Sequence, residues 1–156
     1  MDYYLRHAGI LADAGADLIV LEMMRDVAQT ACALQAGQKT GLPVWVGFSC
    51  EPGESGEMLL LGKSETLSAA VRAISDLGPA AAGVMHTQME DTLEAVRVLK
   101  KECPDMALIV GMASEFVIGM HGGMEFGGKR LAGMFPHEQV KTAEEAGVDI
   151  FGPAVN

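Results

Sequence analysis

A short pattern that occurs four times limits the folds that this chain can adopt. Each time, a glycine is followed by an apolar stretch, and a polar or reactive side chain stands at or near its end. Glycine is common directly after a helix because it tolerates positive φ, and apolar runs rich in β-branched residues are typical of buried strands. The pattern therefore predicts helices that alternate with buried strands. The glycines are Gly15, Gly41, Gly78 and Gly147, and the stretches end at Glu22, Cys50, His86 and near Asn156.

The rest of the chain continues this alternation and predicts an α/β fold with a parallel sheet. Strands that alternate with helices are joined by right-handed crossovers, which place them side by side in one direction. We see no linker and expect a single domain over residues 1–156, with glycine-rich loops at 51–63 and 113–135. Strands are expected at 17–21, 44–49, 80–85, 107–111 and 148–151, and helices at 2–14, 26–40, 64–77, 90–102 and 136–146.

Charge and composition narrow the classes of partner. The formal net charge is −10 and no cluster of basic residues occurs, so nucleic acid and anionic membrane surfaces are not expected partners. No apolar run reaches the roughly 20 residues that span a bilayer, and the first residues lack the basic start and apolar centre of a signal peptide. The three cysteines have no paired spacing that would indicate disulfides. We therefore expect a cytoplasmic protein whose ligand is a small molecule.

The strand ends form the candidate site, because ligands of parallel α/β folds bind beyond the carboxyl ends of the strands. Glu22, Cys50 and His86 end three of the expected strands, and Glu115 follows a fourth. Each residue also has a structural interpretation: Glu22 as a helix cap or the partner of a local cation, Cys50 as core packing, His86 as a hydrogen-bonded polar residue, and Glu115 as a solvated loop acid. Both interpretations stay open for each residue.

Four segments resemble the homocysteine S-methyltransferase family. Residues 15–22 are similar to the strand that reads GADLLxxET in that family, and residues 41–50 are similar to its next strand. Residues 83–87 stand where the family has GVNCT, and residues 146–155 where it has AGAxxxGGCC. Because the order and spacing agree along nearly the whole chain, the resemblance implies a partial (β/α)8 TIM barrel that comprises about strands 4–8.

The resemblance also implies a chemistry and a departure from it. In the family, three cysteine thiolates hold a zinc ion that keeps the homocysteine sulfur deprotonated for methyl transfer. The matching positions here are His86, Ala154 and Val155, so only His86 is a candidate metal ligand, and we expect no zinc to be held. Glu22 matches the glutamate that contacts the amino group of homocysteine, and Glu115 lies near the family's NSGE segment.

Two hypotheses about function follow. The first is a homocysteine S-methyltransferase-like enzyme that transfers a methyl group to a small thiol amino acid, with Glu22, Cys50 and Glu115 binding the substrate. The second is a non-catalytic, degenerate barrel fragment that acts as a binding or assembly module. Five parallel strands cut from a barrel would leave two unpaired edges and an uncovered apolar face, so we expect a homo-oligomer.

Overall fold

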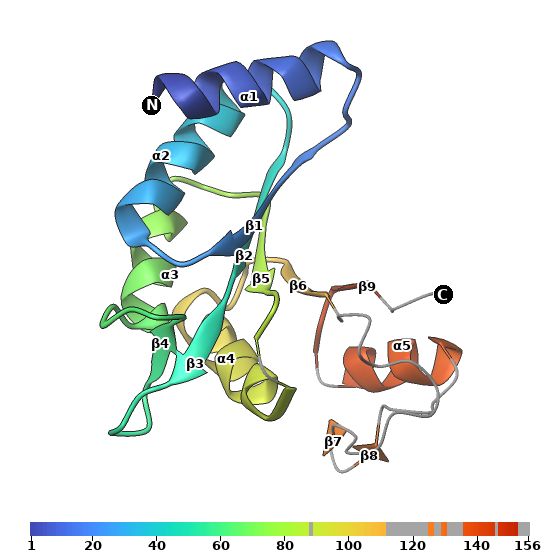
Figure 1. The fold of residues 1–156 in the computed structure, drawn as a ribbon. Coiled ribbons are helices and arrows are strands. Elements are labelled where there is room, and N and C mark those ends of the chain that lie inside the picture. Colours follow the sequence, from blue (N-terminus) through green and yellow to red (C-terminus); the bar gives the residue numbers. More distant parts are fainter. Residues whose placement is uncertain (88, 112–124, 127–128, 131–135, 146, 153–156) are drawn as a thin grey trace.

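A five-stranded parallel sheet forms the centre of the structure, a computed structural model that describes residues 1–87, 89–111, 125–126, 129–130, 136–145 and 147–152 (Figure 1). The strand order is β1-β2-β5-β6-β9, and each neighbouring pair is parallel. The predicted parallel α/β architecture is therefore confirmed. The strands are β1 (Ile19–Met24), β2 (Val44–Phe48), β5 (Ala81–Val84), β6 (Leu108–Gly111) and β9 (Ile150–Gly152).

Two of the described helices begin at a residue whose side chain caps the first turn. The Asp26 side chain accepts a hydrogen bond from the Gln29 N–H at 2.9 Å, and the Thr66 hydroxyl accepts one from the Ala69 N–H at 3.1 Å. The glycines of the repeated pattern have φ between 66° and 87°, as expected near helix ends. Within the described residues, no helix is long and apolar enough to cross a membrane. The helices are α1 (Asp2–Asp13), α2 (Val27–Gln38), α3 (Leu67–Ser75), α4 (Met89–Glu102) and α5 (Pro136–Glu145).

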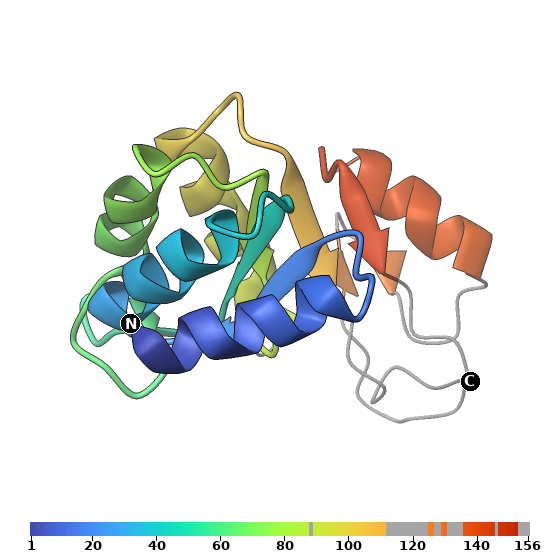
Figure 2. The ribbon, with the colours of Figure 1, turned by 90° about the horizontal axis from the view of Figure 1, so that it is seen from above.

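The two faces of the sheet differ in what lies against them. α2, α3 and α4 lie along one face (Figures 1 and 2), where their apolar side chains enclose a core with strand residues such as Val46 and Phe48. The opposite face, called the open face below, carries a smaller cluster that includes Ala81 and Met85, with Trp45 partly buried against it. Both faces of the sheet are thus apolar, as in the wall of a barrel.

Residues 51–63, predicted to be a loop, instead contain most of an antiparallel hairpin. β3 (Cys50–Pro52) pairs with β4 (Met58–Leu60). Met58 and Leu60 are buried, whereas Leu59 between them is only half-buried. This two-residue alternation is the signal of a strand, and the surrounding glycines and proline concealed it.

Two other boundaries differ from the prediction. The first strand does not stop at residue 21 but continues to Met24, because its pairing with β2 resumes after an irregularity between Leu21 and Met24. Within the stretch 113–135, also predicted to be a loop, β7 (Glu125–Phe126) pairs with β8 (Lys129–Arg130). The other residues of that stretch lie outside the described part of the chain.

β5 and β6 approach each other too closely for a side chain at Gly83. A Cβ atom built there would overlap the carbonyl oxygen of Ile109, which cannot move without moving the strand. We expect Gly83→Ala to lower the free energy of unfolding by about 3 kcal/mol or more, measured by urea denaturation. Gly9→Ala is the matched control, since nothing lies within 4 Å of its added Cβ and alanine favours a helix by about 0.5–1 kcal/mol. Equal unfolding midpoints for the two variants would contradict the close approach.

Candidate active site

Glu22 lies on the open face, and a bulge in β1 follows it. Side chains alternate along a strand, so Glu22 shares the face of Val20, two positions earlier. Leu21 and Met24 both pack against the helix-covered core, although they are three positions apart, because the pairing with β2 shifts between them. The two residues in between, Glu22 and Met23, are exposed, and Met23 has a φ of 55°. Bulges of this kind are frequent beside active sites.

Three hydrogen bonds tie residues 85–87 to the end of β2. The Met85 N–H donates to the Phe48 carbonyl at 2.8 Å. The fully buried Ser49 hydroxyl donates to the Met85 carbonyl at 2.8 Å, and the Cys50 N–H donates to Oγ1 of Thr87 at 3.0 Å. These bonds continue the attachment of β5 to β2 beyond the last paired residues of the two strands. The direction of the chain after β5 is fixed as a result.

His86 lies in the middle of this segment with a strained backbone. Its φ is 51°, in the left-handed region that costs a non-glycine residue about 1–2 kcal/mol. Its side chain is exposed. Strain of this kind persists only where the surrounding structure fixes it, and it is concentrated at functional sites. The hydrogen bonds on either side of His86 supply that constraint and present its imidazole to solvent.

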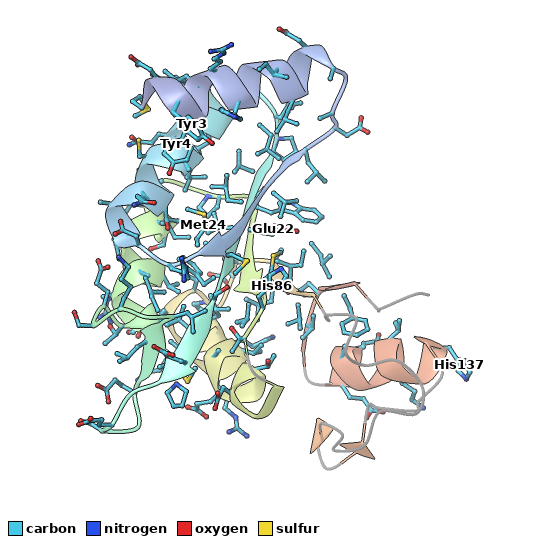
Figure 3. The ribbon with its side chains drawn as sticks, viewed as in Figure 1. Tyr3, Tyr4, Glu22, Met24, His86 and His137 are labelled. Carbon is cyan, nitrogen blue, oxygen red and sulfur yellow. The ribbon has the colours of Figure 1, made fainter. Side chains whose placement is uncertain are left out.

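Glu22 and His86 lie on the same side of the sheet. Figure 3 shows both labelled residues on the side away from α2 and α3, whereas Met24 lies toward the helices. β2 separates their strands, Glu22 stands beside the paired residues Gly47 and Gly83, and His86 is three positions beyond Gly83. At about 3.3 Å per residue and about 4.8 Å per strand, their Cα atoms are within about 14 Å of each other. At this separation one small ligand can contact both residues.

The side chain of Met85 covers the sheet between Glu22 and His86. A Cβ atom at Gly47 would overlap the Met85 thioether, so the thioether lies directly over the glycine. Trp45, two residues earlier on β2, is half-buried on the same face. The gap is therefore bordered by a polarizable sulfur and an aromatic ring, which are favourable neighbours for methyl groups and organic cations.

Cys50 lies away from this gap. β2 ends at Phe48 and the chain bends into β3, which places the Cys50 thiol in the helix-covered core with 1% of the residue exposed. Burial raises the pKa of this thiol to about 12, and a hydrogen bond with Thr87 opposes the rise without cancelling it. The thiol is therefore protonated near neutral pH. Cys50 was expected to bind substrate because a strand was expected to end there, beside the ends of its neighbours. The strand ends at Phe48 instead, and the bend after it turns Cys50 into the core.

The remaining predicted ligands do not assemble a metal site in the described part of the chain. No group of three or more His, Cys, Asp or Glu side chains there could hold a metal ion. Glu115, Ala154 and Val155 lie outside the described residues, and alanine and valine carry no side-chain donor atom. The residues of this chain do not fit the three-thiolate zinc site of homocysteine S-methyltransferases. The suggestion that His86 is a metal ligand stays a prediction.

Ser49, Thr87 and Met85 were not singled out by sequence patterns. Ser49 and Thr87 could have been noticed because Ser49 directly follows an apolar stretch and Thr87 follows one by two positions. Their roles depend on the pairing of β2 with β5, which brings residues 36 positions apart into contact. The place of Met85 over Gly47 follows only from the sheet.

These features define the class of protein: a partial parallel α/β barrel with a candidate site at the carboxyl ends of its strands. The homocysteine methyltransferase MmuM from Escherichia coli, in its metallated form, has this fold, with a TM-score of 0.65 and 14% identity over 97% of this chain and 46% of that one. An HMG-CoA lyase from Brucella melitensis matches with a TM-score of 0.56 and 15% identity over 96% of this chain and 53% of that one. The chain thus spans about half the length of these structures.

Sequence comparison identifies the family. Residues 64–156, more than half of the chain, match the family described as dimethylamine methyltransferase (Dimeth_PyL), and the chain belongs to this family. His86 lies within the matched residues, and Glu22 lies before them. The prediction of a methyltransferase-like barrel is therefore confirmed for the fold, and the family that matches is a methyltransferase family other than the homocysteine S-methyltransferases.

The burial of Cys50 predicts the reactivity of the three thiols. Thiolates are the reactive species, Cys50 and Cys103 are buried, and Cys32 on α2 is partly exposed. Ellman's reagent at pH 8 should therefore modify one thiol rapidly in the folded protein and all three in urea. The rapid phase should disappear in Cys32→Ser. Rapid modification of Cys50 in the folded state, located by peptide mass spectrometry, would contradict its placement.

Proposed function

We propose that this chain forms part of a methyltransferase whose methyl donor is dimethylamine in its protonated form, dimethylammonium. The family supplies the substrate class. The exposed Glu22 carboxylate on the open face is the observation that carries the proposal. A carboxylate beside an aromatic ring and a thioether is suited to a small methylated cation. The chain spans about half the length of its structural relatives.

The methyl-transfer reaction explains why a carboxylate is needed beside the amine. In methyl transfer, the electron pair of a nucleophilic acceptor forms a bond to the methyl carbon. The C–N bond breaks, its electron pair goes to nitrogen, and neutral methylamine leaves. The nitrogen has to carry its extra proton at that moment, because otherwise the leaving group would be an amide anion. A nearby carboxylate favours the charged form of the amine, and we assign this role to Glu22.

Homocysteine is a candidate acceptor in this scheme. Its support is the likeness of the fold to that of MmuM and the resemblance of the strand ends around Glu22. Against it stands the donor set at His86, Ala154 and Val155, which does not fit a three-thiolate zinc site. Methionine formed from homocysteine and dimethylamine would favour this acceptor, and dimethylamine consumption that does not depend on homocysteine would exclude it.

Removing the charge of Glu22 tests the donor site. We expect Glu22→Gln to weaken the binding of dimethylammonium chloride about twofold to fivefold, measured by NMR titration, because an exposed ion pair contributes up to about 1 kcal/mol. Added salt should weaken binding to the unaltered protein more than to the variant. Glu54→Gln, an exposed acid between β3 and β4, is the matched control and should bind like the unaltered protein. Equal affinity of the Glu22 and Glu54 variants would remove Glu22 from the donor site.

The alternative function, a non-catalytic assembly module, predicts self-association. β1 and β9 stand at the two ends of the described sheet order, and Val20 and Met23 on β1 are exposed. Unpaired strand edges of this kind favour pairing with another chain. For this alternative we expect light scattering to give a mass above that of one 16.4 kDa chain, rising with concentration. A constant monomer mass would count against it.

A further inference from the structure

We propose that His86 is the residue that selects dimethylammonium over more highly methylated ammonium ions, by accepting its second N–H. This inference rests on the proposed function, which assigns the first N–H to Glu22. Dimethylammonium has two N–H groups, trimethylammonium has one, and tetramethylammonium has none. A site with two acceptors, one on either side of the nitrogen, would therefore distinguish the three ions by the number of hydrogen bonds that each can donate.

The placement of the two acceptors supports this role. Glu22 and His86 lie on the same side of the sheet, with β2 between their strands (Figure 3). Their Cα atoms are within about 14 Å by ideal strand geometry. Two acceptors that each receive a hydrogen bond of about 2.9 Å from one tetrahedral nitrogen stand roughly 5 Å apart, a separation within the range of these two side chains. The Met85 thioether lies over Gly47 between them, where it can contact the methyl groups.

The attachment of residues 85–87 fixes the backbone of His86, from which such selection starts. Discrimination between ions that differ by one methyl group requires an acceptor held in place, because a mobile side chain would adapt to both. The Ser49 hydroxyl holds the carbonyl of Met85 at 2.8 Å, and Thr87 holds the Cys50 N–H at 3.0 Å. Ser49 and Thr87 are thus positioning residues for His86, which has a φ of 51° that free solvent exposure would not maintain.

The test compares two probes, dimethylammonium chloride and trimethylammonium chloride, by NMR titration at pH 8. We expect the unaltered protein to bind dimethylammonium about tenfold more tightly, the usual effect of one hydrogen bond to a charged group. His86→Asn keeps a residue that tolerates left-handed φ, but its side chain is too short to reach the ligand. The preference should fall to about twofold or less in this variant. In Glu22→Gln, binding of both ions should weaken.

Ser49→Ala tests the positioning role. It should reduce the preference for dimethylammonium as His86→Asn does, although the imidazole is present. Thr40→Val is the matched control: its hydroxyl donates to the Gly37 carbonyl at 2.7 Å beyond the end of α2, away from the site. It should lower stability without changing the preference. A change in preference that appears in both variants would indicate general loosening and overturn the role of Ser49.

The outcomes separate this inference from the proposed function. The role of His86 would be overturned if dimethylammonium bound in a Glu22-dependent way but no more tightly than trimethylammonium. It would also be overturned if the preference survived in His86→Asn. Either result would leave the proposed function standing. If neither ion bound, or if binding were unchanged in Glu22→Gln, both the role of His86 and the proposed function would be overturned. A preference that requires both Glu22 and His86 would establish the two-acceptor site.

Discussion

The hydrogen bonds that join the end of β2 to residues 85–87 hold the candidate site in place. Each contributes on the order of 1 kcal/mol, and together they exceed the roughly 1–2 kcal/mol that the left-handed backbone of His86 costs. The Ser49 hydroxyl is fully buried, so leaving it without its acceptor would add a further penalty. The strained conformation is therefore the most stable one available to this segment.

The bulge in β1 and the hydrogen bonds that follow β5 lie on opposite sides of β2. β2 provides a regular, buried centre, and the residues that present polar side chains belong to its two neighbours. Glu22 lies on the open face by the alternation of the strand, and the bulge after it returns Met24 to the helix-covered face beside Leu21. The arrangement places an acid and an imidazole across an apolar floor, which is suited to a small cation with methyl groups.

Sequence patterns predicted the architecture and suggested a site. The four glycine-led strands follow from local rules of backbone conformation, and they are confirmed. Glu22 and His86 were singled out because side chains at strand ends meet in a parallel sheet, and their role in binding stays a prediction. Cys50 was misplaced because the bend after Phe48 depends on the packing of a hairpin rather than on residue type. Ser49 was missed because its function comes from a carbonyl 36 positions away.

The bulge in β1 also makes this strand tolerant of a change in length. Side chains alternate along a strand, so Glu22 lies on the open face with or without the extra residue, whereas Met24 packs against the helix-covered core because of it. Loss of Met23 would restore regular pairing with β2 and leave both Glu22 and the core where they are. A one-residue deletion or insertion at this point therefore alters the length of an edge strand without exchanging its two faces.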